Sequence, residues 1–206
     1  MALHTGAIRD DLRRVLLVPE EAARLDVRGR TNAAVLVALY VQDDQLSAVF
    51  TKRRDDLRRH AGEISFPGGR RDADDRDLAA TALREAEEEI GLPREAVEIV
   101  GALQPTPTIA TDYAVYPFVG LIEPGRGWTL SPREVEQVLE LPLSALRAGY
   151  GRRRLVRRGL SIRTDTYVVG EHLIWGATAR ILSDLFDRIG PMLAEPMTTW
   201  ASTEDP

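Results

Sequence analysis

The sequence contains no cysteine and few lysine, histidine or aromatic residues. Among 206 residues there are three histidines, and Lys52 is the single lysine in a basic set of 27. The absence of cysteine excludes disulfides, cysteine-ligated zinc and thiol nucleophiles, and it is compatible with a reducing compartment. We interpret the excess of arginine mainly as genome composition, although arginine also provides the forked donors that match phosphate oxygens.

Long apolar runs, repeats and low-complexity tracts are also lacking. No run approaches the 18 apolar residues of a membrane span, and residues 1–14 carry charges where a signal peptide needs an apolar segment. The net charge of −5 and the pI near 5.3 argue against general binding of nucleic acid. We therefore expect a cytoplasmic protein that binds neither membranes nor nucleic acid.

Apolar runs of strand length alternate with amphipathic segments, which predicts one α/β domain. The predicted strands are residues 33–40, 45–52, 97–103, 113–122, 166–169 and 172–174, with a turn at Asp43-Asp44. The predicted helices are 5–16, 77–90 and 176–189. Segment 134–141 reads as a strand or short helix, 142–146 as a helical turn and 152–158 as a hairpin arm. Residues 1–29 are expected to form a helix and connector, 30–190 the main domain and 191–206 a mobile tail.

The stretch from Phe66 to Leu92 concentrates the chemically informative residues. Its Pro-Gly-Gly segment, 67–69, reads as a turn, because two glycines permit positive φ and a close approach to a ligand. Aspartates in 72–77 suit a helix N-cap, and Gly91 suits the C-cap of the helix that follows. On this helix three glutamates share one arc of roughly 100° beside an apolar arc. They are Glu85, Glu88 and Glu89.

Such crowding of carboxylates destabilises a helix by a few tenths of a kcal/mol per pair, which is easiest to explain if a divalent cation lies among them. Carboxylate and carbonyl oxygens suit Mg²⁺ or Mn²⁺ better than zinc. Magnesium also binds phosphate oxygens, so the pattern favours hydrolysis of a diphosphate by water that the metal or a glutamate holds. Arg84 can pair with Glu88 at i+4 and orient the cluster. The competing interpretation is a solvated acidic helix face.

Residues 84–92, REAEEEIGL, resemble the second half of a Nudix box, and Gly69 resembles its opening glycine. Two departures are visible. One extra residue separates Gly69 from Arg84, and Asp72 or Asp75 replaces the first glutamate of the box. This lengthened, aspartate-bearing loop is familiar in the coenzyme A diphosphatase branch of the family.

A second motif resembles the upstream signature of that branch. Its residues, in the order and spacing of that signature, are Thr51, Arg53, Arg58, Gly62 and 66–69. Arg54 replaces the small residue that usually follows the first arginine. The similarity extends to 117–120, 142–143 and 174–180, and so covers roughly residues 30–190. The resemblance implies a Nudix α/β/α sandwich with a mixed central sheet.

The resemblance also implies roles for individual residues. The ligands of Mg²⁺ or Mn²⁺ would be the carbonyl of Gly68 and the carboxylates of Glu85, Glu88 and Glu89. The catalytic residues would be Arg84, Glu85 and Glu88, with the identity of the base left open. The substrate would contact Arg53, Arg58, His60 and Gly69. A further acidic ligand from a later loop would be Asp112, Glu134 or Glu136, among which the sequence does not choose.

By this resemblance the chain is an enzyme that splits the diphosphate of coenzyme A or a derivative into 4′-phosphopantetheine and adenosine 3′,5′-bisphosphate. Homodimers are frequent among such proteins. The alternatives are a Nudix hydrolase of ADP-ribose, NADH or a nucleoside triphosphate, and a non-catalytic module that senses a nucleotide. The arginines at 152–154, 157 and 158 favour a solvated basic hairpin. The second interpretation is that they bind the 3′-phosphate of coenzyme A. Trp128 and Trp175 could stack on a base, although core packing is the default for Trp175.

Overall fold

A computed structural model describes residues 2–54, 56, 62–108, 112–157 and 160–194. The helices are α1 (Ala2–Val15), α2 (Pro19–Ala22), α3 (Leu78–Ile90), the 3₁₀ turn η1 (Arg94–Ala96), α4 (Leu143–Ala148) and α5 (Gly176–Ala194). The strands are β1 (Thr31–Gln42), β2 (Gln45–Arg53), β3 (Ile64–Ser65), β4 (Gly68–Arg70), β5 (Glu98–Ala102), β6 (Thr106–Pro107), β7 (Tyr113–Leu121), β8 (Val135–Pro142), β9 (Tyr150–Arg157), β10 (Leu160–Val169) and β11 (His172–Trp175).

The central sheet is mixed and splits between β1 and β2. Strand β1 runs parallel to β7, which pairs with β5, and β2 carries β8 on its other edge. Near their hairpin β1 and β2 pair directly, but farther along β3 pairs with β2 and β4 pairs with β1. Segment 64–70 therefore lies where the two long strands diverge, and it brings the glycines of β4 into the middle of the sheet.

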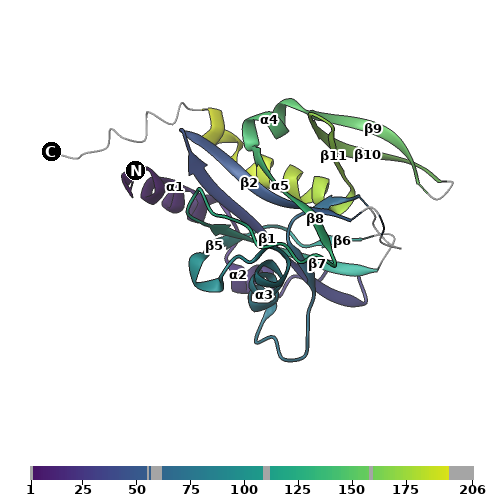
Figure 1. Cartoon of the computed structure of the whole chain (residues 1–206), viewed down its shortest axis with the longest axis horizontal. Helices are drawn as coiled ribbons and strands as arrows, with labels where there is room; N and C mark the ends of the chain where they lie inside the picture. Colours follow the sequence, from purple (N-terminus) through teal and green to yellow (C-terminus); the bar gives the residue numbers. More distant parts are fainter. Residues whose placement is uncertain (1, 55, 57–61, 109–111, 158–159, 195–206) are drawn as a thin grey trace.

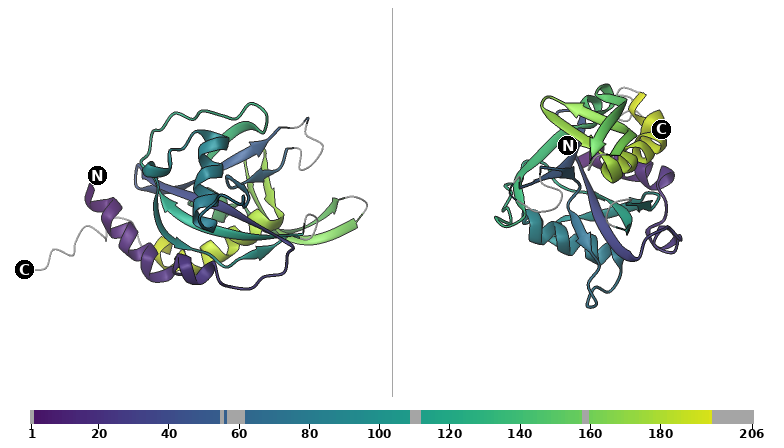
Figure 2. Two further views of the ribbon diagram at one scale, coloured as in Figure 1. Left: turned by 90° about the horizontal axis from the view of Figure 1, so that it is seen from below. Right: turned by 90° about the vertical axis from the view of Figure 1, so that its right-hand side faces the viewer.

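Alternate residues of β1 enter two separate cores. Val37 and Leu39 pack with α1, α4 and α5 on one face, whereas Leu36 and Ala38 pack with α2 and α3 on the other. Figure 1 shows α3 and α5 on opposite sides of the sheet, and the views in Figure 2 agree. The predicted α/β/α sandwich with a mixed sheet is confirmed. Within the described ranges, no helix is long and apolar enough to cross a membrane.

A second, three-stranded sheet of β9, β10 and β11 lies beside α5. Tyr167 of β10 is buried and its ring lies 5.7 Å from that of Phe186 in α5. The outer part of the β9–β10 hairpin projects from the body of the molecule (Figure 1). The predicted basic hairpin arm is therefore present, and Arg152 pairs within it with Asp165 at 3.3 Å.

The structure corrects two sequence predictions. The Pro-Gly-Gly segment is not a free turn, because Gly68 and Gly69 pair with Val35 and Ala34 as part of β4. A Cβ on Gly68 would lie 2.4 Å from the Ala34 carbonyl oxygen, so the glycine permits close approach of two strands. The tail was also predicted to begin at Pro191, yet α5 continues to Ala194 with Pro191 inside it.

Packing accounts for the longer helix. Met192 and Leu193 lie against the same core as Ile189, and this contact outweighs the helix-breaking tendency of the proline. The uncertain segment 134–141 is resolved as strand β8, and the short strand β6 lies inside the predicted loop 104–112.

Candidate active site

Helix α3 is fixed at both ends by residues that the sequence predicts. The Asp77 side chain accepts a hydrogen bond from the Ala80 amide at 2.7 Å, which caps the N-terminus. At the other end Gly91 is left-handed, with φ 68°, and its amide donates to the Ala86 and Glu87 carbonyls. The apolar side of the helix packs on the sheet, and two glutamates of the neighbouring face, Glu85 and Glu89, reach the glycines of β4.

The strongest contact of this region joins Arg84 to Asp75. The guanidinium donates two hydrogen bonds of 3.0 Å to the carboxylate, and both side chains are largely buried, 14% and 6% exposed. Asp75 also accepts from the Thr81 hydroxyl and the Asp72 amide, each at 2.9 Å. The hydrogen bonds from Arg84 are the main reason that the pKa of Asp75 lies well below its usual range.

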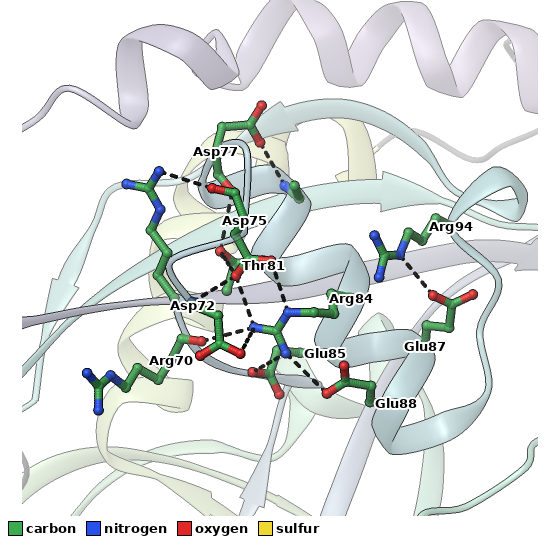
Figure 3. A network of polar contacts seen from close by, with 12 residues as sticks. Arg70, Asp72, Asp75, Asp77, Thr81, Arg84, Glu85, Glu87, Glu88 and Arg94 are labelled. Carbon is green, nitrogen blue, oxygen red and sulfur yellow. Dashed lines mark hydrogen bonds and ion pairs between the residues drawn. The ribbon is translucent and has the colours of Figure 1, made fainter.

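Of the two aspartates that the sequence left open, Asp75 is the partner of Arg84. The Asp72 carboxylate is 3.9 Å from the guanidinium and 67% exposed. Arg84 extends from Asp75 to the glutamates: one nitrogen lies 3.0 Å from the Glu85 carboxylate and donates to Glu88 at 3.1 Å. The i+4 pair predicted for Arg84 and Glu88 is confirmed. Figure 3 shows the guanidinium at the centre of these carboxylates.

Glu89 is the most deeply buried of the three glutamates. The whole residue is 5% exposed, and its carboxylate accepts a hydrogen bond from the Gly68 amide at 3.2 Å. Burial raises the pKa of Glu89 to about 8, and the neighbouring Glu85 carboxylate adds to the effect. Burial also raises the pKa of Glu85. Glu85 and Glu89 are thus two carboxyl groups whose pKa values are raised by burial, and a nearby cation would stabilise each as an anion.

Gly69 makes room for the Glu85 carboxylate. A Cβ at this position would come within 2.5 Å of the Glu85 carboxyl carbon. This contact explains in physical terms why the segment needs its second glycine, because any side chain would displace the glutamate from its place against β4. Gly69 therefore acts on the glutamate in this structure, and its predicted contact with substrate stays a prediction.

The donor atoms have the chemistry of a hard divalent cation site. Carboxylate oxygens of three glutamates and the backbone of Gly68 are the ligands that such ions prefer. Among the described residues, however, no three acidic or histidine side chains converge on one point. Arg84 holds Glu85 and Glu88, and this contact sets their positions. The residue types suit a divalent cation, and so do the raised pKa values of Glu85 and Glu89, because a cation would stabilise their anions. In the structure the Glu85 and Glu88 carboxylates are oriented toward Arg84.

Glu134 is the later acidic residue that lies near this group. It immediately precedes β8, whose first residue pairs with Arg53, and its carboxylate is 3.7 Å from the Arg53 guanidinium. Its charge raises the pKa of both Glu85 and Glu89. The other two candidates pair elsewhere, Asp112 with Arg30 at 3.2 Å and Glu136 with Lys52 at 3.1 Å.

The remaining predicted site residues fall in different places. Arg53 lies beside the glutamates, and its positive charge lowers the pKa of Glu89. Arg58 and His60 lie outside the described residues. Trp128 packs against the core beside α3 and donates its indole N–H to Glu140, and its stacking on a base stays a prediction. Trp175 ends β11 and is half-buried.

A family model described as the NUDIX domain matches residues 30–158. The chain belongs to this family. A relative named as an uncharacterized Nudix hydrolase, NudL, from Enterobacter sp. (strain 638), is 40% identical over 92% of this chain and 98% of its own length. A protein of the same name from Salmonella paratyphi B is 42% identical over 77% of this chain and 83% of its own length.

Among solved structures, a MutT/nudix family protein from Enterococcus faecalis has a TM-score of 0.55 at 15% identity, over 86% of this chain and 70% of that one. This likeness concerns the fold alone. The family match and the relatives make the chain a Nudix hydrolase, of the pyrophosphohydrolase class that generally uses divalent metal ions. The glutamates of α3 lie inside the matched range.

The raised pKa of Glu89 predicts a pH dependence for the metal-free enzyme. Between its ordinary value near 4.5 and about 8, the folded protein binds a proton that the unfolded chain has released. The free energy of unfolding therefore falls as pH rises through this window, by up to about 1.4 kcal/mol per pH unit from this group.

Urea unfolding of the chelator-treated protein at several pH values measures this slope. The Glu89→Gln variant lacks the titrating group, so the difference in unfolding free energy between the two proteins isolates its part. Saturating divalent metal should reverse the trend, since the metal binds the deprotonated carboxylate. A difference that stays constant from pH 5 to 8 would contradict the assignment.

Proposed function

We propose that this Nudix hydrolase cleaves the diphosphate of coenzyme A or a derivative, with Mg²⁺ or Mn²⁺, to give 4′-phosphopantetheine and adenosine 3′,5′-bisphosphate. The observation that carries the substrate class is the location of the upstream signature. Its described ends, Arg53 of β2 and the two glycines of β4, lie next to the glutamates of α3. Arg53 faces Glu134 and acts on the pKa of Glu89.

Glu85, Glu88, Glu89 and the Gly68 carbonyl are the proposed ligands, and Glu134 is added to them because its charge reaches both buried glutamates. A bound divalent cation supplies charge neutralisation for the diphosphate and for the transition state. The attacking water forms a bond to one phosphorus, the bond from that phosphorus to the bridging oxygen breaks, and the bridging oxygen leaves with the other phosphate. A carboxylate of the glutamate set accepts the proton of the water.

Arg84 and Arg53 have different proposed tasks. Arg84 is occupied by Asp75, Glu85 and Glu88, so its task is to orient the carboxylates. Arg53 holds a buried Nε without a hydrogen-bond partner among the described residues, and its guanidinium lies 3.7 Å from the Glu134 carboxylate. A phosphate oxygen would satisfy this donor, which supports the proposed contact of Arg53 with substrate.

The substrate assignment is tested by incubating the enzyme with Mn²⁺ and either coenzyme A or ADP-ribose, with products separated by chromatography. Both substrates contain an adenosine diphosphate, so the comparison isolates recognition outside the reacting group. We expect coenzyme A to give the higher kcat/KM and the two named products. Dephospho-coenzyme A is the matched control for the 3′-phosphate. Turnover of ADP-ribose with coenzyme A untouched would refute the substrate and leave the family assignment intact.

We also propose a catalytic domain of residues 30–190, a cytoplasmic location and a homodimer. The domain range exceeds the matched range because α5 supplies the core on one face of the sheet. The absence of cysteine supports a reducing compartment. The homodimer is supported by the family resemblance alone.

A further inference from the structure

Residues 123–134, the 123–134 loop, join β7 to β8 and run beside helix α3. Two loop amides donate to carbonyl groups of the last helical turn, Thr129 to Ile90 at 3.1 Å and Ser131 to Glu89 at 2.9 Å. These carbonyls have no partner inside the helix, so the loop satisfies them. A Cβ on Gly91 would lie 2.8 Å from the Thr129 side chain, which shows how closely the two segments approach.

At its middle the loop is held by Trp128. The indole N–H donates to Glu140 of β8 at 2.5 Å, and the other oxygen of the same carboxylate accepts from the Tyr40 hydroxyl of β1 at 2.5 Å. The carboxylate therefore connects the loop to two strands of the central sheet. Burial, with the Glu140 carboxylate, raises the pKa of Tyr40 to about 12, so the phenol remains a donor.

At its downstream end the loop carries Glu134 to the glutamates. Arg54 donates from its side chain to the Pro132 carbonyl at 3.1 Å and from its amide to the Glu134 carbonyl at 3.2 Å. The Glu134 carboxylate then faces Arg53. Contacts along the loop from Trp128 to Pro132 thus hold the path that leads to Glu134.

We propose that Trp128 and Glu140 are positioning residues of this enzyme, because their hydrogen bond holds the 123–134 loop along α3 and so places Glu134 beside Glu85 and Glu89. Neither residue touches the substrate or the reacting atoms. The inference rests on the proposed role of Glu134 at the cation site. It predicts that a change at Trp128 or Glu140 alters the affinity for metal, in the way that outer contacts support the ligands of other metal centres.

The test is a titration of Mn²⁺ against the substrate-free protein, with free Mn²⁺ measured by electron paramagnetic resonance. Trp128→Phe keeps an aromatic ring but removes the N–H donor together with one ring of the indole. We expect about tenfold weaker binding of Mn²⁺. Glu140→Gln, which weakens the acceptor, should shift the affinity in the same direction. Circular dichroism and thermal melting verify that each variant is folded.

Tyr40→Phe is the matched control, because it removes the other hydrogen bond to the same carboxylate without touching the loop. It should lower the melting temperature by a similar amount and leave Mn²⁺ affinity unchanged. An equal loss of affinity in Tyr40→Phe and Trp128→Phe would overturn the inference, since general loosening of the sheet would then explain both.

A double-mutant cycle of Trp128→Phe and Glu134→Gln tests the positioning role of Trp128 separately from the proposed role of Glu134 at the cation site. If Trp128 acts through Glu134, the Trp128→Phe change should weaken Mn²⁺ binding in the wild-type background and add nothing in the Glu134→Gln background. Weaker binding in Glu134→Gln but not in Trp128→Phe would overturn the inference and keep Glu134 in its role. Unchanged Mn²⁺ binding in Glu134→Gln would show that Glu134 is not a ligand, and the positioning inference would then also be overturned. Turnover of coenzyme A by the wild type is measured independently of all these outcomes.

Discussion

Replacing Glu89 by Gln is expected to lower kcat by about three orders of magnitude or more while the fold survives. The change removes one negative charge from the proposed cation site, and a metal contributes several kcal/mol to the stabilisation of transition-state charge. Glu89 is the most buried of the three glutamates, so water can replace its carboxylate least effectively. The loss should therefore persist at saturating metal and substrate.

The fold is expected to survive because the structure accommodates a neutral side chain at this position. The Gln carbonyl can still accept the Gly68 amide, which is the hydrogen bond that Glu89 makes. With its pKa near 8, the metal-free Glu89 is already protonated over most of the neutral range. The melting temperature of metal-free Glu89→Gln at pH 8 should thus equal or exceed that of the wild type.

Glu87→Gln is the matched control for this variant. Glu87 lies on the same helix, but it is 44% exposed and pairs with Arg94 at 2.8 Å, away from the network around Arg84 (Figure 3). Steady-state kinetics at saturating Mn²⁺ should find Glu87→Gln within about twofold of the wild type, as expected for an exposed pair. Near-normal turnover by Glu89→Gln would remove this residue from the metal site, and an equal loss in both variants would implicate the charge of the helix.

Features set by local sequence could be predicted without the structure. The apolar and acidic arcs of α3, its cap at Asp77 and its end at Gly91 depend on residues within a few positions of each other. The three glutamates and their i+4 contact with Arg84 follow from the same helical period. Local spacing thus determines which side chains a helix presents together, and the prediction reached the correct residues.

Features set by long-range pairing could not be predicted. Asp72 and Asp75 both precede the helix, and only the folded loop determines which one meets Arg84. Glu134 comes near α3 because β8 pairs with the end of β2, a register that the sequence does not reveal. The Pro-Gly-Gly segment was misread for the same reason, since two glycines are needed equally by a tight turn and by a short strand that closely approaches β1.

Replacing Asp75 by Asn is expected to destabilise the protein by about 2–3 kcal/mol, whereas Asp72→Asn should change the unfolding free energy by less than about 0.5 kcal/mol. The first change leaves the buried Arg84 guanidinium without its two-point carboxylate partner, and an amide can supply only one acceptor oxygen. The second removes a charge that is exposed and 3.9 Å away. Urea unfolding at pH 7 measures both differences.

The pH dependence of this difference follows from the lowered pKa of Asp75. A carboxyl group whose pKa is depressed by folding stabilises the protein above its unfolded value of about 4, and the contribution is lost as pH falls below that value. The gap between wild type and Asp75→Asn should therefore be full at pH 7 and shrink below about pH 4. A gap that is independent of pH would show that packing, and not the charge of Asp75, stabilises the loop.

Turnover should follow the same order as stability. Because Arg84 also contacts Glu85 and Glu88, release of its guanidinium from Asp75 frees it to move and disturbs both carboxylates. We expect Asp75→Asn to lower kcat about 10- to 100-fold at a temperature where it remains folded, and Asp72→Asn to retain nearly full activity. Equal activities of the two variants would mean that the contact between Asp75 and Arg84 supports the fold alone. A loss confined to Asp72→Asn would transfer the role of the missing first glutamate of the box to Asp72.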